Sequence, residues 1–447
     1  MNAPPSATAE DAPARVLLIG SDELSAVTQR VLRDAGAIVT NLRDAGDPAI
    51  RTALGRPIDT VVVVSRDDHV SLRNALIVED ARPGVPLVVT IFDRAVAAEL
   101  RRAVRNVRVM SMADIVVPML AAPCLDEGLL SLHRTPAGLR GVRPSDDGPQ
   151  IGAIEPPRRS RSRRLLAAAG ACLRPHDLSA KILLGGTLGF ALVLLLDAIA
   201  TMLVLHETVI DGLYAATKVI VTVGPNEHVD EGPAWFKLFS AAMMLAALGF
   251  TALLTAGVVN RALDRRLIAL AGRRCLPRSD HVVVVGLGQI GLRLCLLLRE
   301  LGVPVLAIER DPEADYVSRA KEAGIPVVIG HGSSRYVLRR MSLRRARALA
   351  AVTSDEIENI AIVVTAHGEH EQLRTLLRAG RGDFSNQTRA LLQLGLVHDV
   401  YRIGGTLLAA AALGSDADEA FVCGQDVHLV LPDGRMTAFG VDGVRAA

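Results

Sequence analysis

Two long apolar runs in the middle of the chain restrict its fold more than any other feature. The first extends from Ile182 to Leu205 with Asp197 as its one ionisable residue, and the second, from Leu238 to Val259, has none. Each is longer than the roughly 20 residues that cross the hydrocarbon core of a bilayer as a helix. A buried core helix is the alternative for either run, but two such runs close together are rare in soluble α/β proteins. We therefore expect two transmembrane helices.

Basic residues flank the two runs on their outer sides, whereas the stretch 206–237 between them holds more carboxylates than lysines. The flanking residues are Arg158, Arg159, Arg161, Arg163, Arg164, Arg174 and Lys181 before the first run, and Arg261, Arg265, Arg266, Arg273 and Arg274 after the second. The positive-inside rule then predicts a multi-pass protein of the plasma (inner) membrane with both termini in the cytoplasm. The Ala/Pro-rich start of the chain lacks the pattern of a signal peptide, which agrees with this orientation.

The arginine cluster before the first run could contact nucleic acid or lipid headgroups. Its position shortly before a spanning helix favours the headgroups of the bilayer. The net charge is only +2, from 50 Lys plus Arg against 48 Asp plus Glu, so no global field favours nucleic acid. We expect a lipid bilayer as partner and no nucleic acid.

The segment 208–226 between the runs reads TVIDGLYAATKVIVTVGPN, and its apolar part is too short to span. A short helix followed by T-V-G, between two spanning helices, resembles the pore loop of two-helix potassium channels, where T-V-G-Y-G presents backbone carbonyls to the ion. The resemblance implies a monovalent cation in the pore and a homotetramer, because one chain supplies one filter strand. The filter residues would be Thr222, Val223, Gly224, Pro225 and Asn226.

The filter departs from the family because Pro225-Asn226 stand where Tyr-Gly is usual. Proline fixes φ and removes an N–H, so the outer filter cannot keep the usual geometry. Lys218 in the expected pore helix could pair with a nearby carboxylate or repel cations, and Asp197 could form a structural hydrogen bond or coordinate an ion. Gly249 lies mid-span in the second helix and is the candidate gating hinge.

A dinucleotide fingerprint opens the C-terminal part of the chain. An apolar strand, HVVVVG from residue 281, runs directly into a glycine-rich turn and an apolar helix, and a second strand then ends in Glu309. The glycines of the turn are Gly286, Gly288 and Gly291. Such glycines let the backbone approach phosphates, the helix N-terminus attracts their charge, and an acid about 20 residues on can hold ribose hydroxyls. Nucleotide binding is the expected role, and a structural tight turn is the alternative.

Together with IPVVIG at 325–330 and VTSDEIEN at 352–359, this fingerprint closely resembles the regulator-of-potassium-conductance (RCK) domain of the TrkA-N type. The resemblance implies NAD(H) or an adenine nucleotide as ligand. The family usually has Gly-Asp after the third strand, but here His331 follows Gly330, so no contact by that Asp is carried over. The expected binding residues are Gly286, Gly288, Gln289, Ile290, Gly291, Glu309, Arg310, Gly330 and Thr353.

The N-terminal part also resembles an RCK domain, more faintly, from RVLLIG at Arg15 onward. Its first turn keeps only Gly20 and places Asp22 and Glu23 where phosphates would lie, so we expect a role in assembly rather than a dinucleotide site. The expected fold class is therefore mixed, because the chain combines a two-helix transmembrane pore module with two α/β Rossmann-like RCK domains. Its ranges are 1–14 (disordered), 15–125 (N-terminal RCK domain), 126–179 (basic Pro/Gly-rich linker), 180–262 (pore module) and 279–447 (C-terminal RCK domain and its extension).

Five widely spaced cysteines without a C-x-x-C pair argue against a zinc site and a disulfide framework, and no other pattern assigns a metal. No set of catalytic acids, bases or nucleophiles stands out, so we do not expect an enzyme. The leading interpretation is a ligand-gated, potassium-type cation channel of a bacterial plasma membrane. The alternatives are a membrane-anchored NAD-dependent oxidoreductase and a nonconducting sensor or regulatory subunit of a cation transport system.

Overall fold

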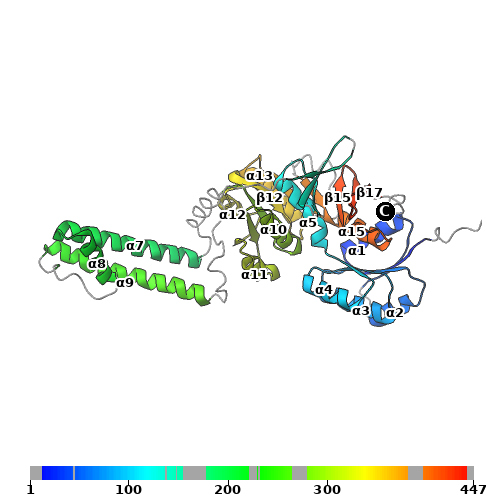
Figure 1. Ribbon diagram of the computed structural model, residues 1–447, viewed down its shortest axis with the longest axis horizontal. Helices are drawn as coiled ribbons and strands as arrows, with labels where there is room; N and C mark the ends of the chain where they lie inside the picture. The colour runs from blue at the N-terminus through cyan, green and yellow to red at the C-terminus, as the bar shows by residue number, and fades with distance from the viewer. Residues whose placement is uncertain are drawn as a thin grey trace, which may run out of the picture. The chain divides into compact units, whose positions relative to one another are not determined.

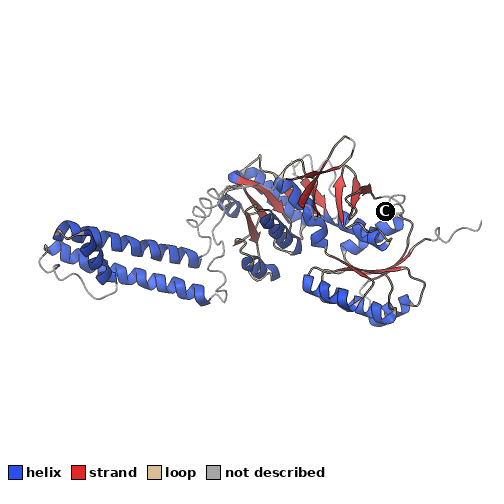
Figure 2. Cartoon of the chain, viewed as in Figure 1, coloured by secondary structure: helices blue, strands red, loops and turns tan. Residues whose placement is uncertain are grey.

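The computed structural model falls into two compact units. One comprises residues 1–163, 277–320 and 327–447, and the other comprises residues 164–276 and 321–326. The first unit holds the α/β domains and the second the long apolar helices, and each is described by itself (Figures 1 and 2). The residues described are 13–43, 46–135, 138–146, 148–154, 178–220, 229, 232–263, 279–380 and 396–439.

The N-terminal domain is built on a parallel five-stranded sheet of order β2-β1-β3-β4-β5. Its central strands are almost entirely apolar and buried, as expected for a parallel sheet covered on both faces. The strands are β1 (Arg15–Ile19), β2 (Ile38–Leu42), β3 (Thr60–Val63), β4 (Leu87–Thr90) and β5 (Val107–Met110). The helices are α1 (Glu23–Asp34), α2 (Asp47–Leu54), α3 (Asp68–Ala81), α4 (Arg94–Ala103) and α5 (Met112–Leu125).

The C-terminal domain repeats this plan with a parallel sheet of order β11-β10-β9-β12-β13-β14. The strands are β9 (His281–Val285), β10 (Val305–Glu309), β11 (Val327–Ile329), β12 (Ala346–Ala351), β13 (Thr375–Ala379) and β14 (Leu396–Asp399). The helices are α10 (Gln289–Glu300), α11 (Asp315–Glu322), α12 (Arg335–Arg340) and α13 (Glu356–Glu369), with a 3₁₀ turn η4 (Leu343–Arg345). Both sheets therefore have the doubly wound, Rossmann-like form that the sequence predicts.

The helix that follows the last strand of each sheet packs against the other domain. Helix α5 lies on α10 and β12 of the C-terminal domain, and α15 (Val400–Ala412) lies on α1, β3 and β4 of the N-terminal domain. Both helices are apolar on all sides and largely buried, as such a position requires. A Cβ on Gly405 would stand 3.1 Å from the backbone nitrogen of Thr28, so this glycine allows α15 to approach α1 closely. The two domains thus exchange helices.

Two small antiparallel sheets follow these helices. They are formed by β6 (Ser131–Thr135), β7 (Gly138–Arg143) and β8 (Gln150–Ala153), and by β15 (Glu419–Cys423), β16 (Asp426–Val430) and β17 (Met436–Ala438). Val142 of one sheet packs with Phe421 and Val430 of the other in a small apolar cluster. The expectation of a linker over 126–179 is therefore wrong for 131–153, because cross-strand pairing and burial against the second sheet order a stretch whose own composition looks loop-like.

The second unit contains three helices, α7 (Leu178–Leu205), α8 (Val209–Ile220) and α9 (Ala234–Leu263). The stretches Ile182–Leu205 and Ala234–Val259 are long and apolar enough to cross a membrane, so the second starts four residues earlier than the 238–259 expected. Many of their leucines are exposed, which separates them from the core helices of a soluble protein. The short α8 packs against α7 and α9 and occupies the place of the expected pore helix.

Glycines let α7 and α9 approach each other. A Cβ on Gly186 would stand 3.1 Å from the backbone nitrogen of Leu254, and one on Gly257 would stand 3.2 Å from the Cα of Leu183. Small residues at such crossings are typical of membrane helices, where close van der Waals packing holds helices together. Gly249, by contrast, has no atom within 4 Å of its Cβ position and takes no part in this crossing.

Candidate nucleotide site and its surroundings

The three glycines of the turn between β9 and α10 have different roles. Gly286 has a φ of +95°, and a Cβ there would lie 2.8 Å from the backbone nitrogen of Thr353. A Cβ on Gly291 would stand 1.9 Å from the carbonyl oxygen of Gly286. Gly288 is different, because it is the N-cap residue of α10 without a side-chain cap and its Cβ position has no neighbour within 4 Å. The turn is thus tightly packed at Gly286 and Gly291 and open at Gly288, where the N-terminus of α10 favours an anion.

The carboxylate of Glu309 lies beside this turn. Its Oε2 accepts a hydrogen bond from the backbone N–H of Leu287 at 2.7 Å, and its Oε1 accepts from the N–H groups of Arg310 at 2.8 Å and Asp311 at 3.1 Å. The N–H of Gly330 donates to the carbonyl of Glu309 at 2.8 Å, which ties the end of β11 to the same point. Glu309 is therefore held where a ribose would follow a phosphate at Gly288.

Asn359 fixes the neighbouring strand ends, a role that sequence reasoning did not assign. Its Oδ1 accepts from the N–H of Thr353 at 2.9 Å and from the Thr353 hydroxyl at 2.8 Å. Its Nδ2 donates to the carbonyls of Thr353 at 3.2 Å and Arg378 at 2.9 Å. Because Asn359 is only 1 % exposed, it locks the carboxyl ends of β12 and β13 together next to Gly286.

The remaining residues expected at the site fall into two groups. Arg310 is exposed, whereas Ile290 is buried, so only the backbone of Ile290 could face a ligand. Gln289 points out of the turn, and its Nε2 donates to the carbonyl of Arg66 in the N-terminal domain at 3.3 Å. The structure therefore brings the glycines, Glu309 and Thr353 together, while their contact with a ligand stays a prediction.

The equivalent turn of the N-terminal domain is filled by a side chain. Asp22 is the N-cap of α1, and its Oδ1 accepts from the N–H of Ser25 at 2.8 Å. A Cβ on Gly20 would stand 2.6 Å from the carbonyl of Val64. Since a carboxylate already occupies the helix N-terminus, the turn is a poor phosphate site, as the sequence suggested.

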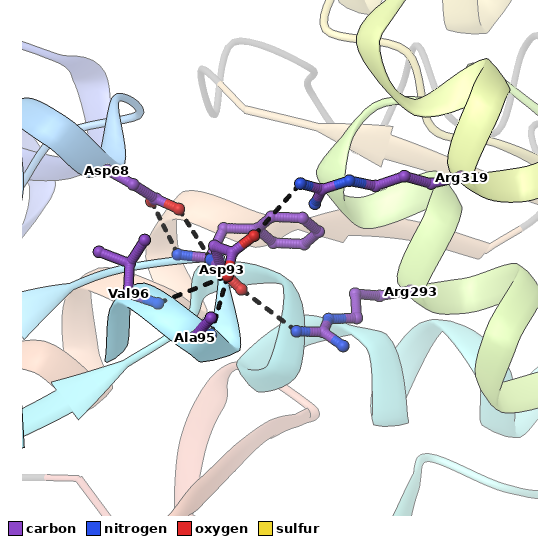
Figure 3. Close-up of polar contacts among 7 residues, drawn as sticks. Asp68, Asp93, Ala95, Val96, Arg293 and Arg319 are labelled. Atoms are coloured by element: carbon purple, nitrogen blue, oxygen red, sulfur yellow. Dashed lines mark hydrogen bonds and ion pairs between the residues drawn. The ribbon is translucent and has the colours of Figure 1, made fainter. Parts of the chain in front are cut away.

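The loop after β4 of the N-terminal domain contacts α10 and α11 (Figure 3). The Arg293 guanidinium donates to the carbonyl of Phe92 at 3.2 Å and lies 4.9 Å from the centroid of its ring. It also lies 3.4 Å from a carboxylate oxygen of Asp114 on α5. Arg319 donates to Asp93 at 3.2 Å. A cation over an aromatic face and two ion pairs thus join the two domains beside the glycine turn.

Asp68 and Asp93 hold the loop after β4 in shape. The two carboxylate oxygens of Asp68 accept from the N–H groups of Phe92 at 2.8 Å and Asp93 at 2.7 Å (Figure 3). Asp93 is the N-cap of α4, and hydrogen bonding from the N–H of Ala95 is the main cause that lowers its pKa. Burial is the main cause that lowers the pKa of Arg293, which still remains charged.

Within the membrane unit, Asp197 is only 3 % exposed and therefore faces protein, as expected for a carboxyl group in a spanning helix. The Lys218 ammonium lies 5.4 Å from the ring centroid of Tyr214. Asp211, on the same helix, accepts a hydrogen bond from the Thr208 hydroxyl at 2.5 Å. The expected filter, Thr222, Val223, Gly224, Pro225 and Asn226, lies outside the described residues.

No group of three or more His, Cys, Asp or Glu side chains in the described part of the chain is placed to hold a metal ion. Cys124 and Cys295 are free and buried. Burial raises the pKa of the Cys124 thiol to about 12, and burial likewise raises that of Cys295. These two thiols are unreactive at neutral pH.

The fold combines two helices that are long and apolar enough to span a membrane with two Rossmann-like domains, one of which carries an open glycine turn. Residues 282–398 match the TrkA-N domain family. "Potassium channel protein 1" of Methanocaldococcus jannaschii is 21 % identical over 245 residues, which cover 52 % of this chain and 71 % of that protein. "Voltage-gated potassium channel Kch" of Escherichia coli K12 is 21 % identical over 215 residues, 47 % of this chain and 51 % of that protein.

Among solved structures, the GsuK channel superposes with a TM-score of 0.50 and 14 % identity, over 91 % of this chain and 64 % of that one. At this identity the likeness shows a shared fold. The chain spans about half the length of the E. coli relative and less than two thirds of the GsuK channel chain. The chain is thus similar to proteins described as potassium channels, and its C-terminal Rossmann-like domain matches the TrkA-N family.

Proposed function

We propose that the chain is one subunit of a ligand-gated, potassium-type cation channel in a bacterial plasma membrane. The observation that carries the proposal is the glycine turn, open at Gly288 beside Glu309, in the same chain as two spanning helices with a short helix between them. Four copies close the pore around a monovalent cation, and both termini lie in the cytoplasm.

The ligand in this proposal is NAD(H) or an adenine nucleotide at the C-terminal RCK domain. Its phosphates lie against Gly288 and the N-terminus of α10, and Glu309 binds a ribose hydroxyl. Support comes from the TrkA-N match over this domain and from the open turn. A nucleotide can gate the pore only by binding the open and closed states unequally. Gly249, free of packing contacts, is the proposed hinge of the inner helix.

The test is cation flux through the purified full-length protein in liposomes, with potassium, sodium and calcium compared with and without NAD⁺, NADH, ADP and ATP. We expect potassium flux that one of these nucleotides changes, and we expect Gly288→Ala to remove only the nucleotide effect. Potassium flux in the wild type that is unaffected by every nucleotide would contradict the gating. NADH consumption without flux would favour the membrane-anchored oxidoreductase instead.

A nonconducting sensor subunit is the second candidate, because Pro225-Asn226 replace the Tyr-Gly of the usual filter. The double change Pro225→Tyr with Asn226→Gly separates the two candidates. A sensor would leave wild-type liposomes without flux while nucleotide still binds, and the double variant would then gain potassium flux. A channel would conduct in the wild type, and the double variant would sharpen the selectivity for potassium over sodium.

A further inference from the structure

Two arginines from different domains converge on one tyrosine at the carboxyl edge of the C-terminal sheet. Arg378 of β13 donates to the hydroxyl oxygen of Tyr401 at 3.1 Å, and Arg66, in the loop after β3, donates to the same oxygen. The guanidinium carbons lie 5.6 Å and 5.9 Å from the centroid of the Tyr401 ring. Tyr401 stands in the first turn of α15 and is only 6 % exposed, so its hydroxyl is held in place.

Two guanidinium charges lie close together at this point. Within the described residues, neither Arg66 nor Arg378 makes an ion pair with a carboxylate, whereas Arg293 and Arg319 in the same domain interface each do. Burial is the main cause that lowers the pKa of Arg378, and the charge of Arg66 lowers it further, whereas the contact with Tyr401 and the charge of Glu23 act in the opposite direction. A guanidinium stays protonated at neutral pH, so two like charges remain close together in partly desolvated surroundings. Such a pair is stabilised when an anion joins it.

Two chains of contacts place this arginine pair beside the glycine turn. Gln289, whose side chain points out of the turn, donates from Nε2 to the carbonyl of Arg66 at 3.3 Å. On the other side, Asn359 joins the carbonyl of Arg378 to Thr353, and Thr353 packs directly behind Gly286. The arginine pair and Gly288 therefore share the carboxyl edge of one parallel sheet, the edge at which ligands of such sheets bind.

We propose that Arg66, Arg378 and Tyr401 form a phosphate-binding site that receives a phosphate group of the nucleotide bound at the glycine turn. The inference rests on the proposed function for the identity of the ligand. Because Arg66 belongs to the N-terminal domain, a bound nucleotide connects the two RCK-type domains directly. The N-terminal domain thus contributes to a ligand site although its own turn is closed by Asp22.

The test measures binding to the full-length protein in detergent by calorimetry, with NAD⁺, ATP, adenosine and inorganic phosphate as ligands. Arg66→Gln is the main variant, because Arg66 is exposed and its loss should not unfold the chain. Tyr401→Phe keeps the buried ring and removes the hydroxyl that orients both guanidiniums. Arg102→Gln, which removes an exposed ion pair on α4, is the matched control.

Whichever of NAD⁺ and ATP binds more tightly should bind Arg66→Gln on the order of 10-fold to 100-fold more weakly, the usual effect of losing a charge-assisted hydrogen bond. The affinity for adenosine should not change. Tyr401→Phe should weaken nucleotide binding less, and Arg102→Gln not at all. Nucleotide binding should also slow hydrogen exchange at residues 64–70 of the N-terminal domain, in the wild type but not in Arg66→Gln.

Unchanged nucleotide affinity in Arg66→Gln, with binding lost in Gly288→Ala, would overturn the phosphate site and leave the proposed nucleotide site standing. A second outcome would also overturn the assignment to the nucleotide. In that outcome the affinity for inorganic phosphate falls in Arg66→Gln while the affinity for the nucleotide does not change. A wild type that binds none of the nucleotides would overturn both proposals.

Discussion

The glycines of the α10 turn differ in what a side chain would meet, and this difference separates folding from binding. A methyl group on Gly291 would collide with a backbone carbonyl, which cannot move without opening the turn. A methyl group on Gly288 would meet no protein atom and would enter only the space in front of the helix N-terminus. The backbone of Gly288 has a φ of −81°, which alanine adopts without strain.

We predict that Gly291→Ala lowers the free energy of unfolding by about 1–3 kcal/mol, the usual cost of forcing an extra group into a packed site. Gly288→Ala should unfold like the wild type and bind nucleotide at least about tenfold more weakly, since the methyl group stands where a phosphate must approach. Denaturant unfolding and calorimetric titration measure the two effects. Nucleotide affinity equal to that of the wild type in Gly288→Ala would contradict the assignment of the site.

The pair of His133 on β6 and Glu419 on β15 joins the two small sheets, with 2.8 Å between His Nδ1 and the carboxylate. Burial raises the pKa of Glu419 above its ordinary value of 4.5, and His133 opposes this only in part. A carboxyl group whose pKa is raised on folding stabilises the protein while it is protonated. This stabilisation is complete below the unfolded value and is lost as the pH rises through the folded pKa.

The free energy of unfolding of Glu419→Gln should therefore rise relative to that of the wild type as the pH increases from about 4.5 upward. The rise should be no more than about 1.4 kcal/mol per pH unit. The glutamine keeps a hydrogen-bond acceptor for His133 and never carries a charge. Urea unfolding of both proteins over this pH range measures the difference. A difference that is constant with pH would show that burial does not govern the ionisation of Glu419.

At the scale of elements, α10 serves two purposes. Its N-terminus forms the open end of the glycine turn, and one of its sides carries Arg293 into contact with Phe92 and Asp114 of the N-terminal domain. The side chain of Arg293 is only 14 % exposed, whereas Arg102 on α4 forms an ion pair with its side chain 75 % exposed. Removing one partner of a buried ion pair lowers the free energy of unfolding more than removing one partner of an exposed pair.

Arg293→Ala should lower the free energy of unfolding by about 1–3 kcal/mol, because it removes a cation over an aromatic ring and leaves Asp114 without its partner. Arg102→Ala should change it by less than about 0.5 kcal/mol. Chemical denaturation of the two variants under the same conditions is the measurement. Equal effects would mean that the contacts of α10 with the N-terminal domain contribute little to stability.

At the scale of the α/β unit, the exchange of α5 and α15 makes each domain depend on the other. Helix α15 follows the last strand of the C-terminal sheet, yet it completes the core over α1, β3 and β4. Leu408, in the middle of this helix, is fully buried. Leu408 lies about one helical turn after Gly405, whose Cβ position faces Val27 and Thr28 of α1, so we expect a cavity made there to lie against the N-terminal domain.

We predict that Leu408→Ala lowers the free energy of unfolding by about 2–5 kcal/mol and speeds hydrogen exchange in β3 as well as in α15. Leu76→Ala on α3, where the leucine is 42 % exposed, is the control and should change exchange little. Hydrogen exchange followed by mass spectrometry gives both readouts. Faster exchange confined to α15 would argue that the domains unfold independently.

The sequence by itself predicted the features that depend on neighbouring residues. The spanning helices follow from the length of two apolar runs, and α7 and α9 contain them. The strands around the fingerprint follow from apolar runs next to glycine, and β9 begins at His281 and β10 ends at Glu309, as predicted. Asp355, in the segment VTSDEIEN, caps α13.

Only the tertiary structure decided what joins residues far apart in the chain. No local pattern indicates that α15 covers the N-terminal sheet, that 131–153 pairs into strands against β15–β17, or that Arg66 meets Tyr401 and Arg378. These arrangements depend on which apolar surfaces each domain leaves for the other to bury and on ion pairs formed after that burial. The physical reason is that local spacing determines which side chains share a face of one element, whereas the partner of that face is selected by packing over the whole unit.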